Sequence, residues 1–127
     1  MPKQILIIDD EQDLLDIMEI YFKDEGFKVK TTAVTDDIIK MVHSYKPDLI
    51  ILDYKLKEVN GGELCFLLKE HPKTKHLPVI IFSASSKVVH FFDKYKCDLF
   101  IAKPFDLFYL IDKVRLIINT QRTLVNT

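Results

Sequence analysis

Acids, a hydroxyl and an amine stand in this sequence at the points where apolar runs end. Parallel strands of an α/β sheet end at one shared edge, where ligands bind, so these side chains are expected to meet in one pocket. Three carboxylates, a hydroxyl and an ammonium in one pocket can bind a divalent cation and a phosphoryl group. The side chains are Asp9 and Asp10 after 5–8, Asp53 after 49–52, Ser83 after 79–82, and Lys103 after 98–102.

The adjacent acids Asp9 and Asp10 admit two interpretations. An Asp at the start of a helix can cap free N–H groups and complement the helix dipole. Capping does not require two adjacent acids, nor the third acid, Asp53, after a neighbouring strand. Acids that pack together repel, which raises their pKa values or recruits a cation. Mg²⁺, or Mn²⁺ in its place, prefers oxygen ligands of this kind, so the sequence favours a metal site over simple caps.

Asp53 and Lys103 indicate the chemistry of the pocket. The residues after Asp53 do not begin a helix, so this acid is a poor cap, whereas a carboxylate nucleophile can form an acyl phosphate. A lysine before a helix N-terminus opposes the helix dipole, so Lys103 is better explained by contact with a phosphoryl oxygen. Ser83, beside the small Ala84, can donate to another phosphoryl oxygen. The sequence leaves open whether the Lys103–Pro104 peptide bond is cis or trans.

Strand-like and helix-like segments alternate five times along the chain. The continuous apolar run 49–52 indicates a buried parallel strand, whereas the alternation in 27–31 indicates an edge strand. This pattern predicts an α/β protein of the (βα)5 type, with a parallel sheet between two layers of helices. We expect a cap at Thr35 or Asp36 and a turn at 60–62. The predicted strands are 5–8, 27–31, 49–52, 79–82 and 98–102, and the predicted helices lie around 14–22, 38–45, 64–68, 88–95 and 107–118.

The composition is that of an ordinary globular protein, with 127 residues, 48% hydrophobic, and a net charge of −1. The length predicts one domain, placed at 1–120, with a short polar tail at 121–127. Scattered basic residues argue against direct binding of nucleic acid or of an anionic membrane. No apolar stretch approaches the roughly 18 residues of a membrane span and no signal peptide is recognisable, so a cytoplasmic setting is expected. Cys65 and Cys97 show no metal-like spacing and are expected to be core thiols.

Taken in order, the polar residues after the strands form one pattern, made up of Asp9-Asp10, Asp53, Ser83-Ala84 and Lys103-Pro104-Phe105. This pattern resembles the receiver domain of two-component response regulators, over about residues 3–120. The resemblance implies a flavodoxin-like three-layer sandwich with strand order 2-1-3-4-5, and a signalling switch rather than an enzyme. It also implies a sensor histidine kinase or a histidine phosphotransfer protein as phosphoryl donor, and a protein as downstream target.

The resemblance implies a role for each position of the site. Phosphorylation falls on Asp53, from which water later removes the phosphoryl group. Ser83 and Lys103 hold the phosphoryl oxygens, and Phe100 changes rotamer when the serine moves. The face formed by the fourth helix, the fifth strand and the fifth helix changes in turn. The metal ligands are Asp10 directly, Asp9 partly through water, Asp53, and the backbone carbonyl of Lys55, while Gly61 matches the glycine of the loop after the acceptor.

The chain departs from the family pattern in two regions. Lys57 stands where a proline is common, and Lys55 occupies a position that tunes the lifetime of the phosphate. Lys96-Cys97 replaces a common Gly-Ala, and the segment between the serine and the lysine of the site is shorter than usual. The fourth helix is therefore expected to be shortened or displaced.

Aromatic side chains gather around the same region, where most are expected in the core and the rest on an exposed patch for a partner or a homodimer. They are Phe91, Phe92, Tyr95, Phe100, Phe108 and Tyr109. The histidines show no ligand spacing and are expected at the surface or in turns; they are His43, His71, His76 and His90.

Two alternatives to the phosphorylated switch remain. Phosphatases that resemble the haloacid dehalogenase family carry Asp-x-Asp after the first strand, whereas here Asp9 is followed two positions later by Glu11. A phosphorylation-independent interaction module could keep the fold without the chemistry, although all five site positions are intact. A flavodoxin lacks support because no Ser/Thr/Gly-rich phosphate loop lies between Ile8 and Leu14.

Overall fold

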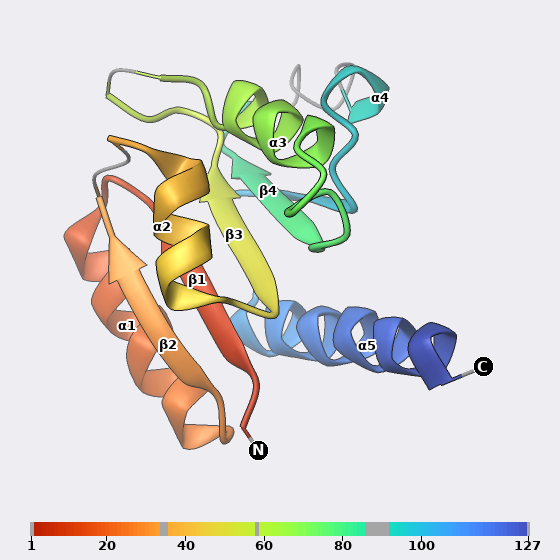
Figure 1. Ribbon diagram of the computed structural model, residues 1–127. Helices are drawn as coiled ribbons and strands as arrows, with labels where there is room; N and C mark the ends of the chain where they lie inside the picture. The colour runs from red at the N-terminus through yellow and green to blue at the C-terminus, as the bar shows by residue number, and fades with distance from the viewer. Residues whose placement is uncertain (1, 34–35, 58, 86–91, 127) are drawn as a thin grey trace.

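The computed structural model of the chain describes residues 2–33, 36–57, 59–85 and 92–126. Five parallel strands form one sheet in the order β2-β1-β3-β4-β5, which confirms the predicted fold (Figure 1). Each predicted strand is present, with small shifts at its ends. The strands are β1 (Gln4–Ile8), β2 (Lys28–Thr32), β3 (Leu49–Asp53), β4 (Val79–Ser83) and β5 (Leu99–Ala102).

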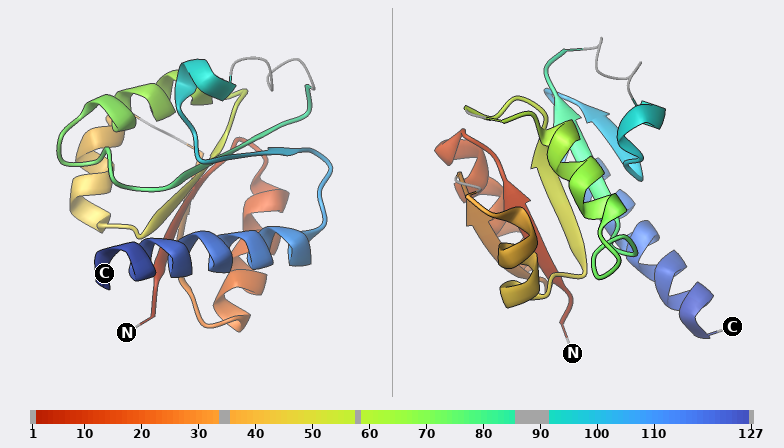
Figure 2. Two further views of the ribbon diagram at one scale, coloured as in Figure 1. Left: turned by 90° about the vertical axis from the view of Figure 1, so that its right-hand side faces the viewer. Right: turned by 45° about the horizontal axis from the view of Figure 1, so that its top comes forward.

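Helices cover both faces of the sheet, so the chain forms the predicted three-layer sandwich (Figures 1 and 2). α1 and α5 pack on one face, and α2, α3 and α4 on the other. Among the described residues, no helix is long and apolar enough to cross a bilayer. The helices are α1 (Gln12–Asp24), α2 (Ile38–Tyr45), α3 (Gly61–Glu70), α4 (Phe92–Tyr95) and α5 (Leu107–Asn126).

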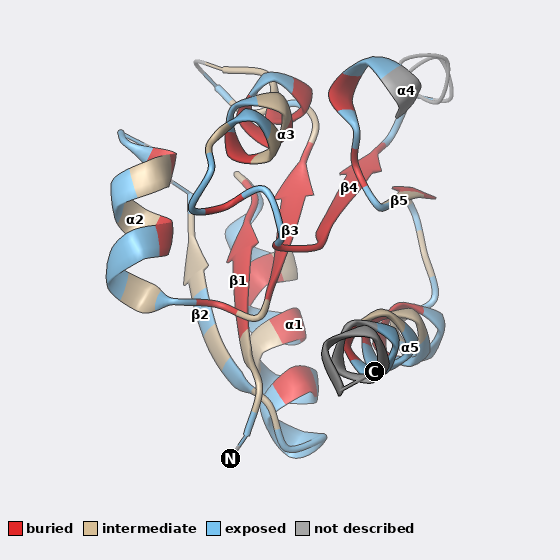
Figure 3. Ribbon diagram, turned by 45° about the vertical axis from the view of Figure 1, so that its right-hand side comes forward, coloured by how far each residue is buried: buried red, intermediate tan, exposed pale blue. Residues whose placement is uncertain are grey.

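Both faces of the central strands are apolar, because alternate residues point to opposite helix layers. In β1, Ile5 and Ile7 pack on the side of α1 and α5, whereas Leu6 and Ile8 pack on the side of α2 and α3. Every residue of β3 and β4 is buried, as the continuous apolar runs predict. No residue of β2 is fully buried, as expected of an edge strand (Figure 3).

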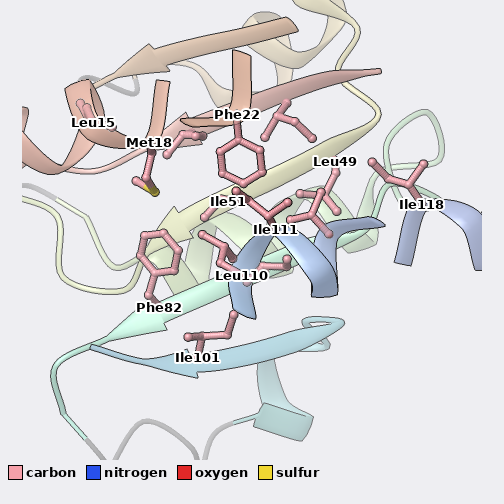
Figure 4. Packing of buried hydrophobic residues seen from close by; sticks show 14 residues of the cluster. Leu15, Met18, Phe22, Leu49, Ile51, Phe82, Ile101, Leu110, Ile111 and Ile118 are labelled. Atoms are coloured by element: carbon pink, nitrogen blue, oxygen red, sulfur yellow. The ribbon is translucent and has the colours of Figure 1, made fainter. Parts of the chain in front are cut away.

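The core between the sheet and the α1/α5 layer fixes the strands that carry the site. Phe22 of α1, Ile111 of α5 and Ile51 of β3 meet there with almost no solvent exposure (Figure 4). Burying a side chain of this size contributes about 1.5–3 kcal/mol. The strand ends are therefore held in place by apolar packing rather than by the polar residues that follow them.

The cap of α2 lies one residue after Asp36 and two after Thr35, the positions considered from the sequence. The Asp37 side chain accepts a hydrogen bond from the backbone N–H of Lys40 at 3.1 Å, which makes Asp37 the N-cap. The prediction of Asp36 is therefore wrong, and Thr35 lies outside the described residues. A side chain caps only from the residue whose backbone leaves the helix, and the sequence shows three polar candidates in a row.

The turn expected at 60–62 is instead the first turn of α3. The Asn60 side chain caps this helix by accepting hydrogen bonds from the N–H groups of Gly62 and Glu63, at 2.7 and 3.3 Å. Gly61 and Gly62 are helical and buried. Adjacent glycines usually mark a turn, but here close packing, described below, requires their small size.

The C-terminal helix also differs from the prediction. The sequence predicts a polar tail from about Thr120, whereas α5 continues to Asn126. No glycine or proline interrupts 107–126, so nothing in the sequence stops the helix. The described part of α4 is short, but residues 88–91 lie outside the described residues, so the shortening of this helix stays a prediction. The Lys103–Pro104 peptide bond is cis.

The cysteines and histidines lie where the sequence places them. Cys65 and Cys97 are buried free thiols, and burial raises the pKa of Cys65 to about 12 and that of Cys97 to about 11, so neither thiol is activated. His43 and His76 are exposed, and His71 is half-buried. His90 lies outside the described residues.

Candidate functional site

The carboxyl ends of β3, β4 and β5 lie side by side at the upper edge of the sheet in Figure 1. In the sheet register, Asp53 pairs with Phe82, and Ser83 pairs with Ala102. The backbone N–H of Lys103 donates to the carbonyl of Ser83 at 2.8 Å, which extends the pairing beyond the strands. Three of the predicted site residues are thus delivered to one edge by the sheet itself.

Lys103 connects the ends of the first and third strands. Its Nζ lies 2.8 Å from Asp9 Oδ2 and 3.5 Å from Asp53 Oδ1. The same nitrogen lies 3.2 Å from Glu11 Oε1 and 5.5 Å from the centre of the Phe82 ring. The predicted convergence of Asp9, Asp53 and Lys103 is therefore present in the structure.

Asp9 makes one contact through each of its carboxylate oxygens, and neither contact tests the metal site. Its Oδ1 accepts a hydrogen bond from the backbone N–H of Glu11 at 2.9 Å, a turn that precedes α1 and does not cap it, since the N-cap of α1 is Glu11 itself. Its Oδ2 accepts the ammonium of Lys103. Asp9 is completely buried, so its charge depends on these partners.

Asp53 is an acid whose charged form is disfavoured by its surroundings. Its exposed fraction is 7%, and its pKa is raised from 3.8 to about 6. Burial is the main cause, followed by the negative charge of Asp9. Lys103 and a backbone hydrogen bond from Lys55 lower the pKa without cancelling these effects. A cation beside Asp53 would therefore be stabilising.

Lys103 is held in its charged form. Burial alone would lower the pKa of the Lys103 ammonium. The hydrogen bond to Asp9 and the charges of Asp53 and Asp9 outweigh burial, and the pKa is raised above 10.5. The lysine therefore remains a donor that can bind an oxyanion.

The loop after Asp53 folds back onto the acid. The N–H of Gly61 donates to the carbonyl of Tyr54 at 2.7 Å, and Lys55 forms an isolated bridge with Asn60. A Cβ atom at position 61 would overlap the backbone carbonyl oxygen of Asp53. Only glycine fits there, which explains why a glycine of this loop is part of the pattern.

Ser83 and Phe100 belong to neighbouring strands and lie on the same side of the sheet, because Ile81, two residues before Ser83 in β4, packs on the α2/α3 side as Phe100 does. Ser83 is 3% exposed, and its Oγ accepts the backbone N–H of Ser85 at 3.0 Å. Phe100 is half-buried in β5 and packs on the α2/α3 side. The roles of both residues in a switch stay predictions.

The metal site stays a prediction as well. Asp10 is half-buried, and the ion pairs of Lys103 are with Asp9, Glu11 and Asp53 rather than with Asp10. In the part of the chain that the structure describes, no three His, Cys, Asp or Glu side chains are arranged to hold a metal ion. Lys103 instead lies between Asp9 and Asp53, where it neutralises part of their charge.

The donor set nevertheless fits Mg²⁺ in its chemistry. All candidate ligands offer oxygen, which a hard divalent cation prefers. Three carboxylates, those of Asp9, Glu11 and Asp53, share the single ammonium of Lys103 among the ion pairs of the described residues. Negative charge therefore exceeds positive charge at the site. Burial is the main cause of the raised pKa of Asp53, and the negative charge of Asp9 adds to it.

Glu11 is a site residue that sequence reasoning missed. Its carboxylate reaches Lys103 although its side chain is 65% exposed. The signal was its position two residues after Asp9, which places both acids at the start of α1 beside the loop that follows β5. Glu11 therefore competes for the lysine that is expected to hold a phosphoryl group.

The comparisons with known proteins agree with this geometry. Residues 5–115 match the family described as the response regulator receiver domain. The chain belongs to this family. Response regulator ArlR of Staphylococcus aureus is 36% identical over 123 residues, which are 93% of this chain and 53% of the relative. The receiver chain thus spans about half the length of the curated relatives it matches.

Solved structures show the same fold. A CheY-like response regulator receiver domain protein from Methanospirillum hungatei is 26% identical, with a TM-score of 0.85 over 97% of this chain and 98% of that one. The response regulator TrrA from Thermotoga maritima, in complex with Mg²⁺–BeF, is 26% identical, with a TM-score of 0.79 over 89% of this chain and 96% of that one. The family resemblance and the fold are confirmed.

Proposed function

We propose that this receiver is a phosphorylation-activated switch of a two-component phosphorelay, with Asp53 as acceptor and Mg²⁺ as cofactor. The donor is a sensor histidine kinase or a histidine phosphotransfer protein, and the output is a change in affinity for a downstream protein. The observation that carries the proposal is the buried acid of raised pKa whose carboxylate lies 3.5 Å from the Lys103 ammonium. We take 1–120 as the receiver unit, since the family match covers 5–115.

The acceptor chemistry follows from Asp53 itself. One carboxylate oxygen forms a bond to phosphorus while the bond from phosphorus to the donor imidazole nitrogen breaks, and the imidazole keeps the electron pair. Lys103 donates to a phosphoryl oxygen, for which it must weaken its contacts to Asp9 and Glu11. The acyl phosphate is later hydrolysed by water, which resets the switch.

The cation is assigned to the oxygen-rich side of the site. Asp9, Asp10 and Asp53 would hold it together with the backbone carbonyl of Lys55. When bound, Mg²⁺ offsets the repulsion between a negative acceptor and a negative phosphoryl group. The relative TrrA is in complex with Mg²⁺–BeF, which supports this assignment.

The switch is assigned to Ser83 and Phe100. The Ser83 hydroxyl turns from the backbone of Ser85 to a phosphoryl oxygen, and Phe100 moves into the space that this vacates. The α4–β5–α5 face then changes shape. Phe108 and Tyr109 of α5 are 63% and 48% exposed, so α5 offers apolar surface to a partner or to a second copy, although the Phe108 ring lies on the α1 side, 6.2 Å from the ring of Tyr21.

Asp53→Asn is the variant that tests the assignment. The wild-type chain is expected to take up label from acetyl phosphate with Mg²⁺ and to bind beryllofluoride, whereas Asp53→Asn should do neither, because an amide is not a nucleophile. Mass spectrometry of the labelled chain locates the modification. The exposed Asp13→Asn serves as the control, and labelling of Asp53→Asn at the wild-type level would contradict the proposal.

Asp10→Ala tests the metal ligands. We expect its affinity for Mg²⁺, measured by titration calorimetry, to fall about tenfold or more, because a carboxylate ligand is lost. Asp13→Ala removes the same charge from the start of α1 without touching the site, so it controls for long-range electrostatics. If Asp10→Ala and the wild type bind Mg²⁺ with equal affinity, Asp10 is not a ligand of the metal.

The two alternatives have distinct signatures. A phosphatase would turn over small phosphate esters catalytically, whereas the switch consumes phosphoryl groups only as fast as its acyl phosphate hydrolyses. In a phosphorylation-independent module, the wild type with beryllofluoride and the Asp53→Asn variant would bind the partner protein with equal affinity. No contact in the described residues favours either alternative over the switch.

A further inference from the structure

Two tyrosines connect the acceptor loop to α4. The hydroxyls of Tyr54 and Tyr95 lie 3.2 Å apart, and their ring centres are separated by 5.9 Å. Tyr54 follows Asp53 directly, whereas Tyr95 is the last residue of α4. The contact spans 41 residues of sequence and joins the acceptor to the helix expected to respond to it.

Tyr54 cannot move independently of the acceptor. Its N–H donates to the carbonyl of Phe82 at 2.8 Å, and its own carbonyl accepts the N–H of Gly61 at 2.7 Å. Both backbone groups are therefore fixed by the end of β4 and by the loop that returns to α3. A displacement of the backbone at Asp53 is transmitted to the Tyr54 ring.

Tyr95 sits in a socket formed by the start of α3. A Cβ atom at position 62 would lie 2.5 Å from the Tyr95 ring carbons, so the ring occupies the space that Gly62 leaves empty. Tyr95 is 5% exposed. The hydrogen bond to Tyr54 raises the pKa of Tyr95, and a hydrogen bond from Asn60 partly offsets this effect. The neutral phenol is thus the form that makes the contact with Tyr54.

The backbone after Tyr95 adopts a left-handed conformation that is unfavourable for a residue with a side chain. Lys96 has φ 60°, in the left-handed region, although it carries a side chain. This conformation costs on the order of 1 kcal/mol and persists where the surroundings enforce it. Lys96 also contacts α3, with its Nζ 3.8 Å from Glu70 Oε1 and 5.8 Å from the centre of the Phe66 ring, so the C-terminal end of α4 lies against α3.

We propose that the Tyr54–Tyr95 hydroxyl contact, here called the tyrosine latch, holds α4 against α3 in the unphosphorylated chain and thereby opposes activation. The proposal rests on the proposed function, since it assigns a conformational restraint to the same site. The contact is longer than the 2.5–3.0 Å typical of O–H···O hydrogen bonds. A small shift of the acceptor loop is therefore enough to open it.

Linkage fixes the sign of the effect. If the latch stabilises only the unphosphorylated conformation, its removal must raise the affinity for a ligand that selects the activated one. A net hydrogen bond of ordinary strength corresponds to about a two- to tenfold change in affinity. A purely structural contact, present in both conformations, would change stability but not affinity.

The experiment compares Tyr54→Phe, Tyr95→Phe and the double variant, which keep the rings and remove only the hydroxyls. With Mg²⁺ present, each single variant is expected to bind beryllofluoride about two- to tenfold more tightly than the wild type, as measured by titration calorimetry. The double variant should match the single variants, because one missing hydroxyl already opens the latch. Hydrogen exchange of the α4 amides without beryllofluoride should be faster in all three.

The control is Tyr21→Phe, which removes a hydroxyl from the exposed surface of α1, away from the α4–β5–α5 face, and should leave affinity and exchange unchanged. Unchanged or weaker beryllofluoride binding in Tyr54→Phe and Tyr95→Phe, with a wild type that binds, overturns the latch and leaves the proposed function intact. A wild type that does not bind beryllofluoride with Mg²⁺ overturns the proposed function, and the latch with it.

Discussion

Lys103→Met is expected to lower the free energy of unfolding by about 3–5 kcal/mol at neutral pH, because it leaves buried carboxylates without their cation. Asp9 is fully buried and Asp53 is 7% exposed, so water cannot replace the ammonium that both acids contact. Methionine keeps the length and apolar contacts of the lysine stem. Urea unfolding in the presence of a chelator measures the loss.

The chain provides a matched control in Lys23→Met. Lys23 Nζ lies 2.8 Å from Glu19, the same separation as between Lys103 and Asp9, but its side chain is 56% exposed whereas that of Lys103 is 12% exposed. Exposed ion pairs contribute about 0–1 kcal/mol, so the two variants should differ by several-fold in their effect on stability. Equal losses in both would show that Lys103 does not neutralise buried charge.

The same variant has a kinetic consequence. Loss of one donor aimed at a transferring group typically slows catalysis about 100- to 1,000-fold, and labelling of Lys103→Met by acetyl phosphate should slow to that extent. Glu11 holds part of the lysine's hydrogen-bonding capacity at 3.2 Å. The Lys103 ammonium that stabilises the unphosphorylated chain is thus also the group that binds the phosphoryl oxygen.

The sequence was informative where chemistry coincides with strand ends. The ends of β1, β3, β4 and β5 are marked by apolar runs that stop, so the sequence alone predicts that Asp9, Asp53, Ser83 and Lys103 lie at one edge of the sheet. Parallel sheets make this inference strong, because every strand delivers its next residue to the same side. The sequence did not show that Lys103 would lie between two of the acids.

Other features depended on tertiary packing and could not be predicted. Asp37 caps α2 in preference to its neighbour because of where the backbone turns, which a run of polar residues does not encode. Gly62 is needed only because the Tyr95 ring fills its place. The contact of Tyr54 and Tyr95 follows from the position of α4 against the loop after β3, which the helical spacing of Tyr95 does not specify.

The pH dependence of the free energy of unfolding should reveal the cost of keeping Asp53 ionised in the folded chain. The pKa of Asp53 is raised from 3.8 to about 6, so the folded chain disfavours the ionised acid relative to the unfolded chain. The stability that Asp53 contributes is fully present below pH 3.8 and is lost as the pH rises through about 6. A shift of this size corresponds to about 2–3 kcal/mol.

Asp53→Asn removes this cost, because its amide does not ionise. At neutral pH, with a chelator present, we expect Asp53→Asn to be more stable than the wild type by about 2–3 kcal/mol in urea unfolding. The difference should shrink as the pH falls through about 6 and vanish below 3.8, where the wild-type acid is protonated in both states. Taking the difference between the two chains cancels the other titrating groups, and the exposed Asp13→Asn should show no such window.

This result would distinguish an acceptor from an ordinary buried acid. An acid buried for stability would be paired well enough that its removal destabilises the chain, so an Asp53→Asn chain less stable than the wild type at neutral pH would contradict our interpretation. A site that binds a cation and a phosphoryl group is instead expected to carry uncompensated negative charge at rest. Lys103 compensates the charge of Asp9 at 2.8 Å more closely than that of Asp53 at 3.5 Å. The acid left with the weaker partner is the one to which the phosphoryl group is assigned.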